Sequence, residues 1–82
     1  MATPRMPNTF IVTCLESNAC KVYFEPFGSE YDLEPGDVLT VETLALQEGH
    51  VEISYSTGAI TLGFTSDHEI KLTNRSGENI RI

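Results

Sequence analysis

The chain has 82 residues, 40% of them hydrophobic, which suits one small domain with a thin stability margin. Twelve acidic residues against five basic ones give a net charge of −7. This balance argues against nucleic acid or a membrane surface as partner, because both bind patches of Lys and Arg. No apolar stretch approaches the ~20 residues that a membrane span needs. The charge itself is typical of a solubilising surface, or of a protein with a basic partner.

The sequence predicts a flexible N-terminal arm at residues 1–7 and a single β-sandwich domain at residues 8–82. Pro4 and Pro7 oppose regular structure in the arm. The arm lacks the continuous apolar core of a secretory signal. Two cysteines are also too few for the disulfide framework of a small secreted fold. We therefore expect a cytoplasmic protein.

The first predicted unit is a hairpin of residues 10–15 and 20–25, in which apolar residues alternate with other types. A three-residue loop at 16–18 sets Cys14 opposite Cys20 and commits both to the core face. Burial raises the pKa of a thiol and makes it inert. We expect a neighbouring pair of reduced thiols, with a disulfide as the alternative.

The second predicted unit consists of two short strands that flank a type II turn. Pro35 supplies the fixed φ of this turn and Gly36 its positive φ. The stretch 33–38 resembles the Pro-Gly-Asp turn common in cupin barrels. The paired histidines and the glutamate of the cupin metal motif have no counterpart around it, so we assign no family. Residues 42–49 fit either one helical turn or a sheet-crossing connection.

From residue 50 onward, alternation predicts a four-stranded meander with one apolar face, whose strands are separated by short loops at 57–58, 66–68 and 75–77. The expected cross-strand pairs are Ile53 with Leu62, Phe64 with Ile70, Leu62 with Leu72, Leu72 with Ile80, and Ile70 with Ile82. Packed on the N-terminal hairpins, this meander gives an all-β fold, a compact antiparallel β-sandwich or flattened barrel of about 7–8 short strands. The alternative is a Greek key, in which adjacent strands belong to different sheets.

No pattern for catalysis, for a cofactor or for a metal stands out, so we expect a non-enzymatic protein without a cofactor. His50 and His68 lack the convergent ligands of a metal site. In the predicted register Lys71 falls directly opposite Arg81. Glu69 offsets the repulsion of these two cations, and the alternative is a weak anion contact.

The predicted first hairpin is apolar on both faces, which is unusual for a sandwich strand that faces water. The spare residues are Ile11, Leu15, Tyr23 and Phe27. Either residues 1–7 or 44–46 fold over them, or another chain does. We expect the latter, and hence a protein-interaction module that self-associates as a homodimer or binds another protein partner. The alternatives are a small-ligand site near three tyrosines, or an acidic charge mimic for a basic site on a larger protein. The tyrosines are Tyr23, Tyr31 and Tyr55.

Overall fold

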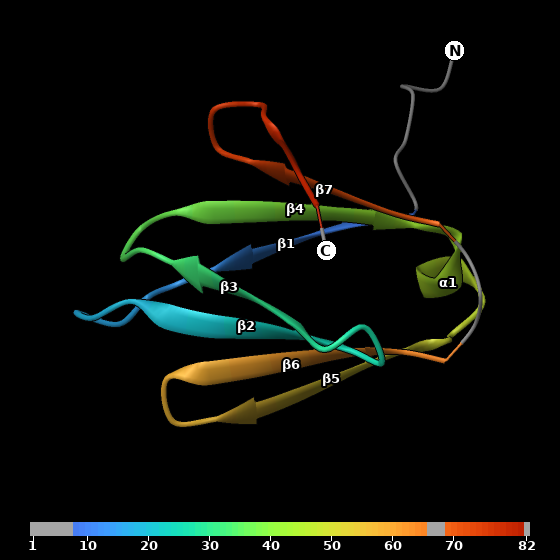
Figure 1. The fold of residues 1–82 in the computed structure, drawn as a ribbon, viewed down its shortest axis with the longest axis horizontal. Helices are drawn as coiled ribbons and strands as arrows, with labels where there is room; N and C mark the ends of the chain where they lie inside the picture. The colour runs from blue at the N-terminus through green and yellow to red at the C-terminus, as the bar shows by residue number, and fades with distance from the viewer. Residues whose placement is uncertain (1–7, 66–68, 82) are drawn as a thin grey trace, which may run out of the picture.

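The computed structural model describes residues 8–65 and 69–81, which form a sandwich of two four-stranded sheets (Figure 1). The strands are β1 (Thr9–Thr13), β2 (Cys20–Glu25), β3 (Ser29–Leu33), β4 (Val38–Thr43), β5 (Val51–Ser56), β6 (Ala59–Phe64), β7 (Ile70–Asn74) and β8 (Asn79–Ile80). The first sheet has the order β1-β4-β7-β8, and the second has the order β3-β2-β6-β5. The predicted all-β sandwich is confirmed, and its two sheets remain separate instead of closing into a barrel.

The core lies between the two sheets and takes one face of almost every strand. Its buried apolar side chains are Val12, Cys14, Cys20, Val22, Phe24, Leu33, Leu39, Val41, Leu62, Phe64 and Leu72. Within each strand these residues recur at every second position, because successive side chains of a strand point to opposite faces. The period-two pattern therefore identified the buried residues of most strands, with β5 as the exception.

The predicted first hairpin is wrong. β1 pairs antiparallel with β4, whereas β2 pairs antiparallel with β3 and parallel with β6, so the sheets are not antiparallel throughout. Residues 14–19 instead cross from one sheet to the other. Alternation determines which face of a strand is apolar, but it does not determine which strand receives the backbone hydrogen bonds.

The C-terminal half confirms two of the predicted strand pairs. Ile53 lies opposite Leu62 in the β5–β6 hairpin, and Leu72 lies opposite Ile80 in the β7–β8 hairpin. The connection between the hairpins was predicted incorrectly, because β7 pairs with β4 and places Leu72 opposite Val41. The four-stranded meander is therefore wrong, and adjacent strands belong to different sheets as in the Greek-key alternative.

Two further predicted pairs involve Ile70. Ile70 lies opposite Thr43 of β4, so its predicted pairing with Phe64 is wrong. The predicted partner of Ile70 on the other side, Ile82, lies outside the described residues, as does the predicted arm at 1–7.

The turn between β3 and β4 has the predicted chemistry. Gly36 has a φ of 78°, and the Asp37 amide donates to the Glu34 carbonyl at 2.9 Å. The Gly36 amide in turn donates to the carbonyl of Cys14 at 2.8 Å. The turn is thereby attached to the end of β1, although β3 and β4 belong to different sheets.

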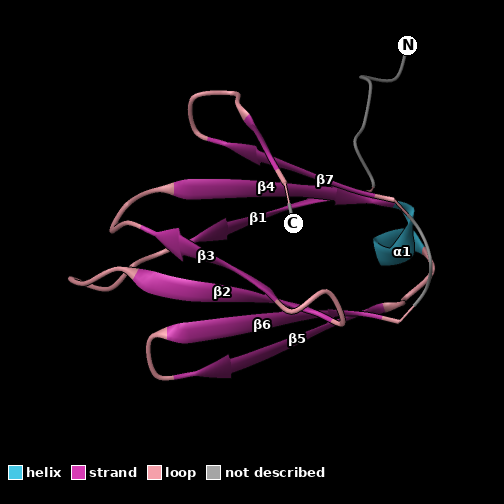
Figure 2. Ribbon diagram, in the orientation of Figure 1, coloured by secondary structure: helices cyan, strands magenta, loops and turns pink. Residues whose placement is uncertain are grey.

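Residues 42–49 combine the two alternatives that the sequence left open. A short helix, α1 (Leu44–Gln47), carries the chain from β4 in one sheet to β5 in the other (Figure 2). The Thr43 hydroxyl accepts a hydrogen bond from the Ala45 amide at 3.2 Å and so caps the helix. Among the described residues, no helix is long and apolar enough to cross a membrane.

Candidate interaction surface

The structure places Ile11 and Tyr23 on opposite outer faces of the sandwich. Ile11 follows β1 residues that pack inward and precedes the buried Val12, so its side chain points away from the core and is 62% exposed. Tyr23 lies between two buried residues of β2 and points outward from the other sheet. One flat contact cannot cover both side chains.

The other two predicted interface residues are also separated. Leu15 lies in the connection that follows β1 and is 90% exposed. Phe27 lies in the turn after β2, where its ring centroid is 6.0 Å from that of Phe64. Phe27 therefore belongs to the rim of the core, and the four predicted residues do not form one patch.

An exposed apolar face that sequence reasoning missed lies on β5. Ile53 is the direct partner of the fully buried Leu62, so both side chains point to the same face of the sheet. Ile53 is nevertheless 58% exposed, and Tyr55 on the same face is 69% exposed. The first sheet thus leaves the core-facing side of β5 uncovered at Ile53 and Tyr55. The sequence carried no signal for this exposure, because it depends on which strands oppose each other.

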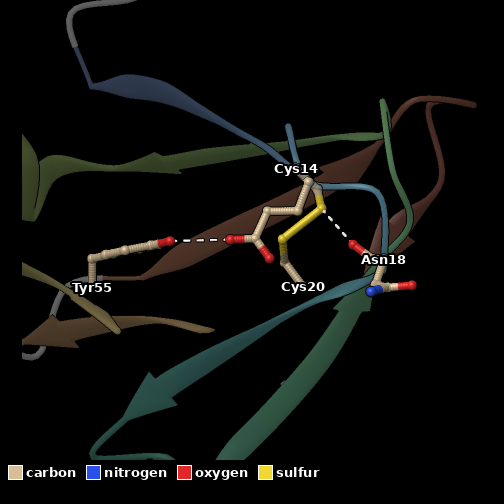
Figure 3. Close-up of a disulfide and its surroundings, with 5 residues drawn as sticks. Cys14, Asn18, Cys20 and Tyr55 are labelled. Carbon is tan, nitrogen blue, oxygen red and sulfur yellow. Dashed lines mark hydrogen bonds between the residues drawn. A yellow bond between two sulfur atoms is a disulfide. The ribbon is translucent and has the colours of Figure 1, made fainter. Parts of the chain in front are cut away.

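The edge strands β1 and β5 lie on the same side of the sandwich. The Tyr55 hydroxyl donates a hydrogen bond to Oε2 of Glu16 at 3.1 Å, which joins β5 to the connection that leaves β1 (Figure 3). The carboxylate stabilises the protonated phenol and raises the pKa of Tyr55 above its ordinary value. This bond links the two sheets at this edge.

The four most exposed large apolar side chains among the described residues lie on β1, on the connection that follows it and on β5; Ile11 points outward from the first sheet, whereas Ile53 and Tyr55 are on the core-facing side of the second. We call them the edge surface, and they are Ile11, Leu15, Ile53 and Tyr55. Ile11 and Leu15 were predicted as interface residues from the sequence. Ile53 and Tyr55 belong to the uncovered core-facing side of β5. Exposed apolar residues are common singly, but several along one edge of a sandwich indicate a contact site.

The edge strands differ in how they are protected against pairing with another chain. β3 carries Glu30 and Asp32, which lie 3.8 Å and 2.8 Å from Nζ of Lys21. β8 is only two residues long, and β5 carries Glu52. β1 has none of these features, because its five residues are uncharged and include no proline.

A disulfide between Cys14 and Cys20 connects the end of β1 to the start of β2, across the two sheets (Figure 3). Their Cα atoms are 5.9 Å apart, so the predicted proximity is confirmed, although the hairpin from which we derived it is wrong. The structure also joins the two sulfurs, whereas we expected reduced thiols. Sγ of Cys14 lies 3.3 Å from the carbonyl oxygen of Asn18, a polar contact without a shared proton because a disulfide sulfur carries none.

The predicted anion contact lies in a groove of about 640 Å³ beside β7 and β8. Lys71 and Arg81 both line this groove, together with Glu42 and Glu69. In the first sheet Lys71 is the cross-strand partner of Glu42, a neighbour that the meander did not provide. Two carboxylates therefore balance the two cations, and the groove has no excess positive charge to select an anion.

The three tyrosines of the alternative ligand site do not converge. Tyr31 and Tyr55 lie on β3 and β5, which form opposite edges of one sheet, and Tyr23 points away from the core. Tyr31 is partly buried, and this burial, with the nearby charges of Asp37 and Glu78, raises its pKa. The three tyrosines therefore do not line a common ligand-binding site.

The histidines contribute little to a common site. Nδ1 of His50 lies 3.5 Å from Oε1 of Glu48, and both side chains are about half exposed. His68 lies outside the described residues. Within residues 8–65 and 69–81, no three His, Cys, Asp or Glu side chains are grouped so that they could hold a metal ion.

Comparisons of the chain with models of known protein families, with curated proteins and with solved structures find no match. We therefore infer function from the chemistry of the described residues, and above all from the edge surface.

Proposed function

We propose that this protein is a non-enzymatic interaction module that self-associates through the edge surface. The observation that carries the proposal is the exposure of Ile53 and Tyr55 on the core-facing side of β5. Full burial of one such side chain contributes about 1.5–3 kcal/mol. A domain of this size has little core, so covering this face by a second chain adds a substantial fraction of its stability.

The charge distribution supports a contact at this location. The whole chain carries a net charge of −7, so two copies repel each other at long range. β1 itself is uncharged, and a contact centred on it brings no carboxylates face to face. Added salt screens the long-range repulsion and leaves the apolar contact intact. Self-association should therefore strengthen as the ionic strength rises.

Several described groups that catalysis could draw on are already engaged, which supports a binding role over an enzymatic one. Cys14 is joined to Cys20, and Lys21 bonds to Asp32. The cations of the groove face carboxylates. None of these arrangements presents an activated nucleophile or an isolated charge to a substrate.

Sedimentation equilibrium of the full chain from micromolar to millimolar concentration tests the proposal. We expect the mean mass to rise from that of one chain toward that of two, and to do so at lower concentration in high salt. Ile53→Lys should weaken the association, whereas Ser54→Lys is the matched control, because Ser54 lies on the outer face of the same strand. A protein that stays monomeric at every concentration in high salt would contradict self-association.

A further inference from the structure

We infer that β1 of a second copy pairs antiparallel with β1 of the first, across a two-fold axis at Ile11. The first sheet would then continue through both copies. This inference rests on the proposed self-association and names the segment that makes the contact.

The ladder between β1 and β4 shows which backbone groups of β1 point away from β4. The Thr43 amide donates to the Asn8 carbonyl at 2.8 Å, so Asn8 and Thr43 form a hydrogen-bonded pair. In an antiparallel ladder bonded and non-bonded pairs alternate, so Phe10 and Val12 also bond to β4. The intervening residues direct their N–H and C=O groups to the open edge. They are Thr9, Ile11 and Thr13.

The sequence of β1 complements itself. Read in either direction, the strand is Thr, apolar, Ile, apolar, Thr. A two-fold axis at Ile11 pairs Thr9 with Thr13 and Ile11 with its own copy, and these are the residues whose backbone groups point away from β4. A two-fold contact requires this self-complementarity, because the same surface contributes both halves. Phe10 then lies opposite Val12 on the core side, a favourable aromatic and β-branched pair.

The same pairing covers the exposed face of β5. Ile53 and Tyr55 are on the core-facing side of β5 yet remain exposed, and Tyr55 bonds to Glu16 just after β1, so a strand added to the β1 edge would lie over this side of β5. Phe10 and Val12 of the second copy would then approach Ile53 and Tyr55 of the first. One contact thus gives hydrogen-bond partners to the edge-facing backbone groups of β1 and buries Ile53 and Tyr55.

A second copy suits β1 better than it suits the opposite edge of the second sheet. A two-fold axis at the centre of β3 would set Glu30 opposite Asp32, and like charges in that relation repel. β8 is too short to form a ladder of useful length. Self-pairing through β1 places no charged residue opposite another.

Proline substitution tests the inference in the full chain. Ile11→Pro removes an amide that faces the open edge, so the β1–β4 ladder keeps its bonds and the fold is retained. Because of the two-fold relation, the substitution removes two intermolecular hydrogen bonds, one from each copy. We expect self-association to weaken by roughly tenfold or more. Ile11→Val keeps the amide and changes only the side chain, so Ile11→Pro should weaken self-association far more than Ile11→Val does if the backbone of β1 forms the contact.

Isotope-filtered NMR on a mixture of labelled and unlabelled chains gives a readout that does not depend on the variant's stability. We expect contacts between the α-protons of Phe10 in one copy and Val12 in the other, which form a non-bonded pair. An associated protein that lacks these contacts and is insensitive to Ile11→Pro overturns strand pairing but not self-association. A monomer, or an edge whose contacts to Ile11 all come from residues 1–7 of the same chain, overturns the inference.

Discussion

Leu62→Ala and Ile53→Ala remove similar apolar groups from directly opposite positions of the β5–β6 hairpin. Leu62 is fully buried, so its truncation loses both transfer free energy and packing around a new cavity. We expect it to lower the free energy of unfolding by about 2–5 kcal/mol. Ile53 is 58% exposed, and less than half of its surface is removed from water. Its truncation should cost about 0.5–1 kcal/mol.

Urea denaturation followed by far-ultraviolet circular dichroism measures both costs, from the transition midpoints and a shared slope. The comparison belongs at low protein concentration, where single chains predominate, because self-association adds stability by mass action. Equal costs for the two variants would refute the conclusion that the first sheet leaves Ile53 uncovered. At high concentration the cost of Ile53→Ala should increase, whereas that of Leu62→Ala should change little.

Three further predictions concern other parts of the structure. Reducing the disulfide, whose cysteines are 6 residues apart, should lower the free energy of unfolding by about 2 kcal/mol, measured by urea denaturation with and without reductant. The pKa of Tyr55 is raised above its ordinary 10.0, so the Glu16 bond contributes stability below that pH and loses it as the pH rises through the folded-state pKa. An absorbance titration should show late ionisation of Tyr55 and of Tyr31, and Tyr55→Phe should remove the part that belongs to Tyr55. Gly36→Ala should cost about 1 kcal/mol, because a side chain strains its positive φ. Gly63→Ala is the milder control in the same thermal melt, since its new Cβ would lie at least 3.6 Å from other atoms.

Local pattern was sufficient for the β5–β6 and β7–β8 hairpins, but not for β2–β3, whose first strand was assigned to another partner. The Thr57–Gly58 turn is two residues long, and it brings Ile53 opposite Leu62 as predicted. The β7–β8 hairpin has the predicted register, and Gly77 has the positive φ of 86° that its loop requires. In these hairpins the turn length alone sets which residues face each other.

The edge surface was only half visible in the sequence. Ile11 and Leu15 were identified because their apolar character exceeds what a water-facing strand needs. Ile53 and Tyr55 were assigned to the core, since their alternation matches that of buried partners. Whether an apolar face is covered depends on the opposing sheet, which no residue of β5 specifies.

The sequence by itself determined the period-two strands, the apolar face of each strand and the turn residues, because these depend on neighbours along the chain. Only the tertiary structure decided that residues 14–19 cross between sheets, and that β7 pairs with β4 of the first sheet and not with β6 of the second. A hairpin and a crossing both keep Cys14 near Cys20 and both bury the same faces. Backbone amides and carbonyls are the same in every residue, so strand pairing is chosen by how the faces of the whole chain pack together.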